Sequence, residues 1–285
     1  SDLYVTRTYG LMVITDSINY LSASRHLLEG KGYIAFNNDV YTWWPPLLPV
    51  ILVFFRGGLT ETDLFAIRFF YLLVFGLNLS LSSYLLKKVS HPVLFLPASL
   101  LLLVSIPLWA TNTTLLSEPF FLLFEVLLLV VWQRLIKKER FTDLLLICLL
   151  LMALCQTRYV GVLLAAAFCL AYLFTGKGSF ARRLIVSVMV GIISTLPLLI
   201  WLWHNLSIEG VLMGYRSATQ TTLLDNFLFA LNMVGKWFLP FNHWGLGATI
   251  ILLTLGSLSY TCKQKLDDSP KSSLFTNWKF NILPV

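Results

Sequence analysis

The stretch LIVSVMVGIISTLPLLIWLW, residues 184–203, contains no charged side chain. A helix that crosses a bilayer needs about 20 mainly apolar residues, so this stretch predicts a membrane-spanning helix. The whole chain has the same character, because 57% of its 285 residues are hydrophobic and only 12% are charged. Ordinary soluble domains carry roughly 25% charged residues. We therefore expect an all-α fold, a polytopic helical bundle in a membrane.

Apolar runs that approach the length of a span occur about seven times in the chain. Lys and Arg follow the first, third, fifth and last runs, so the positive-inside rule makes those loops cytoplasmic. The same loops and lipid headgroups account for the net charge of +7 better than nucleic acid does. The expected spans are residues 64–86, 91–110, 116–135, 142–157, 160–175, 184–203 and 245–262.

Two apolar runs are expected to lie in the outer interface. Residues 45–55 are too short to span after their prolines, and they predict a juxtamembrane helix. Residues 222–239 are interrupted by Asp225 and Lys236, which favours an interfacial helix over a span. We expect the chain to be a fragment that lacks an N-terminal span. The order of expected spans and interfacial helices divides it into four regions. They are an extracytoplasmic loop with juxtamembrane helices (1–63), a transmembrane core (64–203), an extracytoplasmic segment with an interfacial helix (204–244), and a last span with a truncated tail (245–285).

The cysteines and histidines do not predict a metal site. The four cysteines form no CxxC pair and read as small buried hydrophobes, and the four histidines lack ligand spacing. No cofactor is expected to be required, and nothing in the sequence supports a divalent metal. Asn112 and Asn205 begin tripeptides of the glycosylation pattern, which recurs by chance and is left open.

The segment TDSINYLSASRHLLEGKGY, residues 15–33, stands apart from the apolar runs. Its spacing predicts an amphipathic helix on the outer membrane surface between Asp16 and Gly30. Thr15 or Asp16 is expected to cap the helix, and Gly30 or Gly32 to end it in the left-handed conformation. The expected apolar face holds Tyr20, Leu21, Ala23, Leu27 and Leu28, and the polar face holds Asn19, Ser22, Arg25, His26 and Glu29.

Ionisable side chains within or beside spans are costly, which makes each a functional candidate. Glu118 begins the third run and Glu125 follows two turns later, so both are expected to face one outward cavity. Arg158 lies in an outer turn and offers a charged fork suited to phosphate. Simpler roles stay open for each: Asp16 as a helix cap, Glu118 as an acid at a helix start, Glu125 as a polar partner and Arg158 as an interface anchor.

Four short motifs on the outer side occur in a familiar order. They are the segment 15–33, WWPPLLPV (43–50), SEPFF (117–121) and QTRYVGVLL (156–164). In this order they resemble the polytopic GT-C glycosyltransferases, specifically the bacterial branch related to protein mannosyltransferases and aminoarabinose lipid A transferases. The resemblance covers most of residues 10–205 and fades afterwards.

The resemblance implies a sugar donor linked to polyprenyl phosphate, a lipid, glycan or protein acceptor, and inversion at the anomeric carbon. Asp16 matches the family's catalytic acid, but many relatives carry two adjacent acids where this chain has Asp16-Ser17. Arg158 would stabilise the departing phosphate, and Glu118, Tyr20 and Glu125 would complete the substrate-binding site. The expected location is a bacterial inner membrane with the site on the extracytoplasmic face. A transporter or flippase of lipid-linked sugars is the main alternative, and a structural subunit of an envelope complex is a third.

Overall fold

The computed structural model describes residues 10–89, 92–215, 221–236 and 244–253, together with Thr6 and Gly256. Within these ranges the regular secondary structure is helical, and extended pairing is limited to two isolated bridges. The all-helical prediction is therefore confirmed for this part of the chain. The chain divides into two compact units, Ser1–Ser217 and Ala218–Val285, which are described separately.

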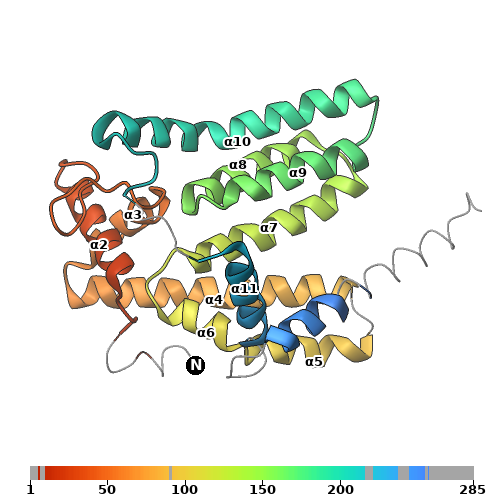
Figure 1. Cartoon of the computed structure of the whole chain (residues 1–285), viewed down its shortest axis with the longest axis horizontal. Helices are drawn as coiled ribbons and strands as arrows, with labels where there is room; N and C mark the ends of the chain where they lie inside the picture. The colour runs from red at the N-terminus through yellow and green to blue at the C-terminus, as the bar shows by residue number, and fades with distance from the viewer. Residues whose placement is uncertain are drawn as a thin grey trace, which may run out of the picture. The chain divides into compact units, whose positions relative to one another are not determined.

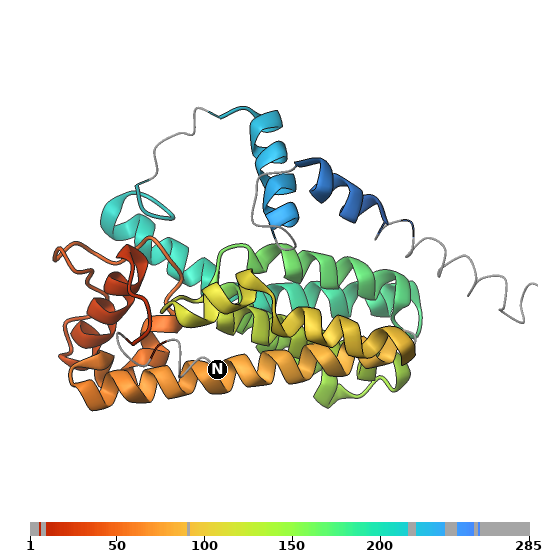
Figure 2. The same ribbon diagram turned by 90° about the horizontal axis from the view of Figure 1, so that it is seen from below.

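In the first unit, long helices run side by side and two short helices gather at one end of them (Figures 1 and 2). The short helices are α2 and α3, and α8 packs between α7 and α10 in the bundle. The elements are α2 (Thr15–Leu28), α3 (Leu47–Val53), a 3-10 turn (Arg56–Gly58), α4 (Glu61–Val89), α5 (Pro92–Leu103), α6 (Ile106–Thr113), α7 (Glu118–Lys137), α8 (Phe141–Thr157), α9 (Gly161–Thr175) and α10 (Phe180–Glu209).

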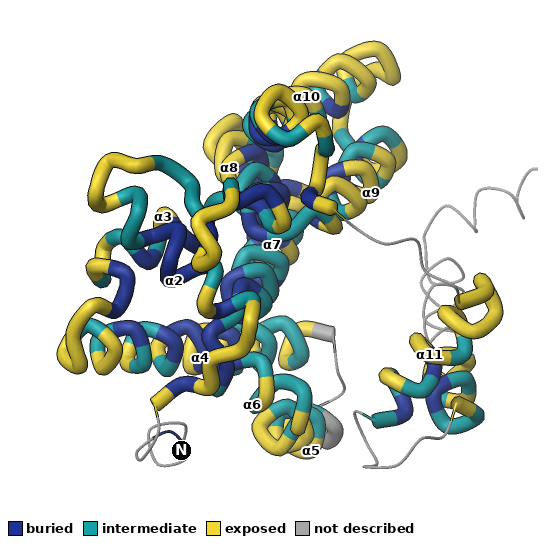
Figure 3. Tube along the Cα trace, turned by 60° about the vertical axis from the view of Figure 1, so that its left-hand side comes forward, coloured by how far each residue is buried: buried dark blue, intermediate teal, exposed yellow. Residues whose placement is uncertain are grey.

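The bundle has the surface of a membrane protein. Ile147, Leu151 and Leu154 of α8 are fully buried, whereas Ile192 and Trp203 of α10 are 58% and 70% exposed. Figure 3 shows the same contrast, with exposed residues along the outer sides of α4 and α10. Apolar side chains on the outside are stable when lipid surrounds the helices.

The prediction of seven spans is not met in the described residues. Three helices, α4, α7 and α10, are long and apolar enough to cross a membrane, and a fourth crossing exists if α5 and α6 form one span. These two helices meet at a bend of 41°, because the run from 91 to 110 is broken before Ile106 and Pro107. α8 and α9 have 17 and 15 residues. At about 1.5 Å per residue both are shorter than a bilayer core of about 30 Å.

The second unit contains two short helices in its described part. They are α11 (Leu223–Lys236) and the helix over residues 244–253, which is the described portion of the predicted last span. Thr222 and Asp225 cap α11 reciprocally, since each accepts a hydrogen bond from the other's backbone N–H at 3.1 Å. The interfacial placement of α11 stays a prediction. The rest of the expected last span and tail lies outside the described residues.

The helix α2 forms where it was predicted, but its start and its faces differ. Ile14 takes the N-cap position, so neither Thr15 nor Asp16 caps the helix. The Ser17 hydroxyl accepts the Ile14 N–H at 3.1 Å, and Asp16 lies in the first turn. The end is as predicted, with positive φ at Gly30 and Gly32.

The expected amphipathic pattern of α2 is only partly correct. Tyr20, Leu21 and Ala23 are buried as predicted, but Ser22 is also buried and Leu28 is 45% exposed. Hydroxyl groups are tolerated inside because they find backbone partners, as when Ser24 donates to the Leu21 carbonyl at 2.7 Å. α2 is therefore packed into the end of the bundle against α3 and the 3-10 turn, which a helix lying on a surface would not be.

The 3-10 turn packs closely against α2 at Gly57, its middle residue. Arg25 donates from Nε to the Gly57 carbonyl at 2.9 Å and from Nη2 to the Gly58 carbonyl at 2.8 Å. The φ angle of Gly57 is +62°, and a Cβ there would lie 2.6 Å from Arg25 Cγ and 2.7 Å from Ser24 Oγ. The contact thus depends on a residue without a side chain.

We expect Gly57→Ala to lower the free energy of unfolding by about 2 kcal/mol or more, because steric overlap adds to backbone strain. Gly30→Ala is the matched control, since Gly30 also has a positive φ of +72° but nothing lies near its missing Cβ. For the control we expect the free energy of unfolding to fall by about 1 kcal/mol, because only backbone strain is added. Thermal unfolding of the purified protein in one detergent measures both, and equal losses would contradict the packing role.

Candidate functional site

Four of the predicted site residues belong to α2 and to the adjoining ends of α7 and α8, and these segments lie at the end of the bundle where α2 and α3 pack (Figure 1). Asp16 and Tyr20 come from α2, Glu118 is the first residue of α7, and Arg158 follows the last residue of α8. α4 positions the start of α7, because Tyr71 donates to the Leu116 carbonyl at 2.7 Å. Segments far apart in the sequence therefore meet at this end.

Glu118 and Arg158 form an ion pair between Oε1 and Nη1. The two side chains are 34% and 39% exposed, so solvent reaches the pair. The second carboxylate oxygen of Glu118, Oε2, is buried and has no hydrogen-bond partner in the described part of the chain. A buried acceptor without a donor is costly, which leaves one strong acceptor position available to a hydroxyl group.

Asp16 is an acid with a perturbed environment. Partial burial raises the pKa of its carboxyl, the Glu118 carboxylate raises it further, and the Arg158 guanidinium opposes them. These couplings place Asp16 within electrostatic range of the Glu118–Arg158 pair. A carboxylate with a raised pKa accepts a proton more readily near neutral pH, which is the property of a general base.

The buried Tyr20 side chain lies close to these charged groups. Its side chain is 2% exposed and its ring lies 5.6 Å from that of Trp44 and 6.2 Å from that of Tyr41, centroid to centroid. Burial is the main cause that raises the pKa of the Tyr20 hydroxyl, and the carboxylates of Glu118 and Asp16 act in the same direction. Tyr20 is therefore a neutral phenol at physiological pH.

Asp16 borders a cleft of about 470 Å³, which we call the Asp16 cleft. Its volume is in the range of small-molecule sites. The loop over residues 35–44 forms much of its wall, with two tryptophan rings, amides and a second acid. The polar and aromatic lining residues are Thr15, Asp16, Asn19, Phe36, Asn37, Asp39, Trp43 and Trp44.

The wall of the Asp16 cleft is anchored at Thr42, which is fully buried. The Thr42 carbonyl accepts hydrogen bonds from the Tyr159 hydroxyl at 3.1 Å and from Asn205 Nδ2 at 3.4 Å. Its own hydroxyl donates to Glu209 Oε2 at 2.5 Å. Sequence reasoning missed Thr42, Asn205 and Glu209, because their roles come from contacts across more than a hundred residues of chain.

Glu125 is separate from the other predicted site residues. It lies within α7, two turns beyond Glu118, and unlike Glu118 it does not contribute to the electrostatic environment of Asp16 or Tyr20. It makes no ion pair in the described part of the chain with Arg158, which pairs with Glu118. The structure thus brings together Asp16, Tyr20, Glu118 and Arg158 and leaves Glu125 outside the group.

The two glycosylation-type tripeptides have inaccessible asparagines. Asn112 and Asn205 are both fully buried. Asn112 donates from Nδ2 to the Leu108 carbonyl at 2.7 Å, and Asn205 donates to the Leu212 carbonyl at 3.0 Å. Both side chains therefore have structural roles in the folded protein.

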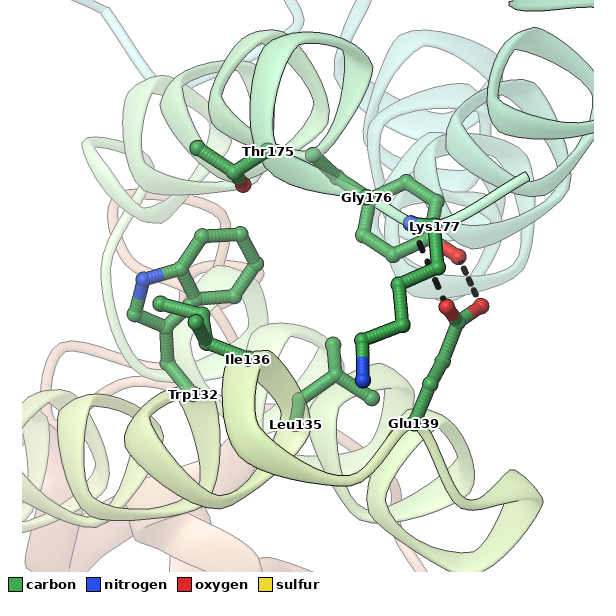
Figure 4. Close-up of a pocket in the computed structure, with 8 residues that line it drawn as sticks. Trp132, Leu135, Ile136, Glu139, Thr175, Gly176 and Lys177 are labelled. Carbon is green, nitrogen blue, oxygen red and sulfur yellow. Dashed lines mark hydrogen bonds between the residues drawn. The ribbon is translucent and has the colours of Figure 1, made fainter. Parts of the chain in front are cut away.

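The opposite end of the bundle carries a small cavity between α7 and α9 (Figure 4). Glu139 accepts hydrogen bonds there from the Tyr172 hydroxyl and from the Lys177 N–H. The same carboxylate pairs with Arg182 at 3.1 Å. These bonds satisfy the acid and join two loops, so we assign this cluster a structural role.

No group of three or more His, Cys, Asp or Glu side chains suited to a metal ion occurs among the described residues. Comparison with known proteins found no match among family models, curated proteins or solved structures. Function is therefore argued from the geometry of this site and from the four sequence motifs.

Asp16→Asn should change stability with pH. The raised pKa means that the folded state holds the proton more tightly than the unfolded chain, so the contribution of Asp16 is favourable below the ordinary value of 3.8 and is lost as pH rises through the raised value. Removing the charge should therefore stabilise the fold at pH 7, by less than about 1 kcal/mol because the group is partly exposed. Melting curves of both proteins from pH 7 down to pH 4 test this, and a gap that widens on acidification would contradict it.

Proposed function

We propose that this protein is an integral membrane glycosyltransferase of the GT-C type, which moves a sugar from a polyprenyl-phosphate donor to an acceptor hydroxyl. The observation that carries the proposal is the electrostatic grouping of Asp16 with the Glu118–Arg158 pair, together with the small-molecule cleft that Asp16 itself lines. An acid with a raised pKa next to a guanidinium fits proton removal beside a phosphate leaving group. The order of the four motifs supports the same chemistry.

Arg158 is proposed to bind the donor phosphate. Without ligand its guanidinium pairs with Glu118, and phosphate oxygens match the planar fork of arginine as well as a carboxylate does. When phosphate takes the place of Glu118, the Glu118 carboxylate becomes free to accept a hydrogen bond from a sugar hydroxyl. Tyr20 would support the same group as a neutral hydrogen-bond donor.

The proposed reaction is a single displacement. Asp16 takes the proton of the acceptor hydroxyl as its oxygen forms a bond to the anomeric carbon of the donor sugar. The bond from that carbon to the phosphate oxygen breaks, and its electron pair leaves with the phosphate. Arg158 stabilises the negative charge that grows there, and attack from the opposite face inverts the anomeric carbon.

The orientation of the bundle supports a site on the outer face of a membrane. The α7–α8 and α9–α10 connections and the helix ends that adjoin them, at the end of the bundle opposite to Asp16, carry Lys137, Lys138, Arg140, Lys177 and Arg182. Positive residues of this kind mark cytoplasmic loops, so the Asp16 end is proposed to be extracytoplasmic. In a bacterium this would be the inner membrane, where a lipid-linked donor and its lipid, glycan or protein acceptor both have access.

Transport of a lipid-linked sugar is the second candidate, and one observation favours it. The bend of 41° between α5 and α6 resembles the interrupted helices that transporters use. Asp16 and Glu118, however, lie at one end of the bundle, and that position suits a reaction at the membrane surface better than transport of a substrate through the bundle. Purified full-length protein in vesicles separates the two, because a transporter moves the lipid between leaflets without forming a new glycosidic bond.

We expect Asp16→Asn to lower the rate of sugar transfer by about a hundredfold to ten-thousandfold, because general base catalysis is lost. The assay is transfer from polyprenyl-phosphate sugars to a membrane extract by purified full-length protein. Glu61→Gln is the control, since Glu61 is an exposed acid at the start of α4. Transfer by Asp16→Asn at the wild-type rate would exclude Asp16 as the base.

Arg158→Lys should keep the positive charge but lose the fork that binds two phosphate oxygens. We expect kcat/KM for the donor to fall by about tenfold to a hundredfold, the effect of a lost hydrogen bond between charged groups. Arg140→Lys at the opposite end, which is exposed, is the matched control. Equal effects of the two substitutions would argue against a phosphate at Arg158.

A further inference from the structure

A second cleft lies further along α2 towards its C-terminal end and has a volume of about 400 Å³. We call it the His26 cleft. Its lining combines five hydrogen-bonding side chains, one aromatic ring and two aliphatic side chains, namely Ser22, Arg25, His26, Glu29, Asn38, Phe36, Ile18 and Leu21. Sequence reasoning treated His26 as incidental, because the cleft exists only when the loop after α2 folds back over the helix.

The loop over residues 34–40 separates the two clefts. It is held to α2 at two points: the Phe36 N–H donates to Asn19 Oδ1 at 3.3 Å, and His26 Nδ1 lies 3.1 Å from the Ile34 carbonyl oxygen. Asn19 and His26 lie close to one line along α2, because seven residues make about two helical turns. Phe36 is 71% exposed and lines both clefts. One aromatic side chain thus stands between Asp16 and the His26 cleft.

Several polar atoms of the His26 cleft remain open to a ligand. The interactions of His26 in the described chain are made through Nδ1, which leaves Nε2 unbonded. Arg25 uses Nε and Nη2 for the carbonyls of Gly57 and Gly58, which leaves Nη1. Glu29 pairs with Lys31 through Oε2 at 2.7 Å, so its charge is balanced while Oε1 stays available.

The chemistry of these groups selects a class of ligand. Hydroxyl groups both donate and accept, and the cleft offers donors from Arg25, acceptors from Glu29 and from Nε2 of a neutral His26, and both kinds of group from Asn38. The exposed Phe36 ring provides an apolar face for C–H groups. This combination fits a neutral sugar ring better than a peptide, which would need an extended groove with backbone partners.

We propose that the His26 cleft binds the acceptor as a saccharide headgroup and presents its hydroxyl past Phe36 to Asp16. The role as acceptor site rests on the glycosyltransferase function proposed above, whereas saccharide binding itself does not. The donor then occupies the Asp16 cleft, and the two substrates approach from opposite sides of the loop 34–40. Binding in the absence of donor is therefore the direct test.

Saturation-transfer NMR with methyl glycosides of common hexoses and pentoses measures that binding. The full chain is placed in lipid nanodiscs, which avoids sugar-containing detergents. For at least one glycoside we expect saturation of the ring protons, and we expect Asn38→Gly combined with His26→Gln to weaken binding about tenfold through the lost hydrogen bonds. Glycine at position 38 suits its φ of +63°, so the backbone is preserved.

Phe54→Ala is the control, because Phe54 is 83% exposed and lines neither cleft. It should bind glycosides as the wild type does. Absence of ring saturation for every glycoside, equal binding by the double variant, or stronger binding of methyl phosphate than of any glycoside would each overturn the proposal. Glycoside binding that persists in a protein without transferase activity would reject the proposed function and leave a saccharide site.

Discussion

The arrangement of the site depends on the hydrogen bonds that the backbone carbonyl of Thr42 accepts. This carbonyl accepts hydrogen bonds from Tyr159, next to Arg158, and from Asn205 near the end of α10. A buried carbonyl that lost these donors would be left without a partner, at a cost of about 1–3 kcal/mol. The same contact fixes the loop that walls the Asp16 cleft. The long helices thus supply a rigid end on which a short polar segment is built.

The division between predicted and unpredicted features of the fold has a physical cause. Helices at α2, α4, α7 and α10 follow from local signals, such as twenty apolar residues or the glycines at 30 and 32. The number of spans could not be predicted in this way, because an apolar run indicates a helix in contact with lipid but does not determine where that helix begins and ends. The bend before Pro107 appears only in three dimensions, whereas the runs that form α8 and α9 were already shorter than a full span in the sequence.

The site divides in the same way. Asp16, Glu118 and Arg158 were singled out because charges near spans need a reason, and the structure brings them together. Glu125 was singled out for the same reason and was grouped with Glu118 by helical spacing, but spacing along one helix does not determine which neighbour faces it. Thr42 and His26 gave no signal in the sequence, since their importance arises from a backbone carbonyl and from a loop that folds back on α2.

The broken pair α5 and α6 also has a consequence for the surrounding lipid. The Trp109 indole donates to the Leu103 carbonyl at 2.6 Å, so the break satisfies part of its own backbone within the chain. If α5 and α6 form one span, its bend of 41° makes it reach less far along the bilayer normal than a straight helix of equal length. Beside such a span the two leaflets would draw closer together, and for the proposed transfer reaction a thinner membrane would shorten the distance that a lipid headgroup must travel to leave the lipid.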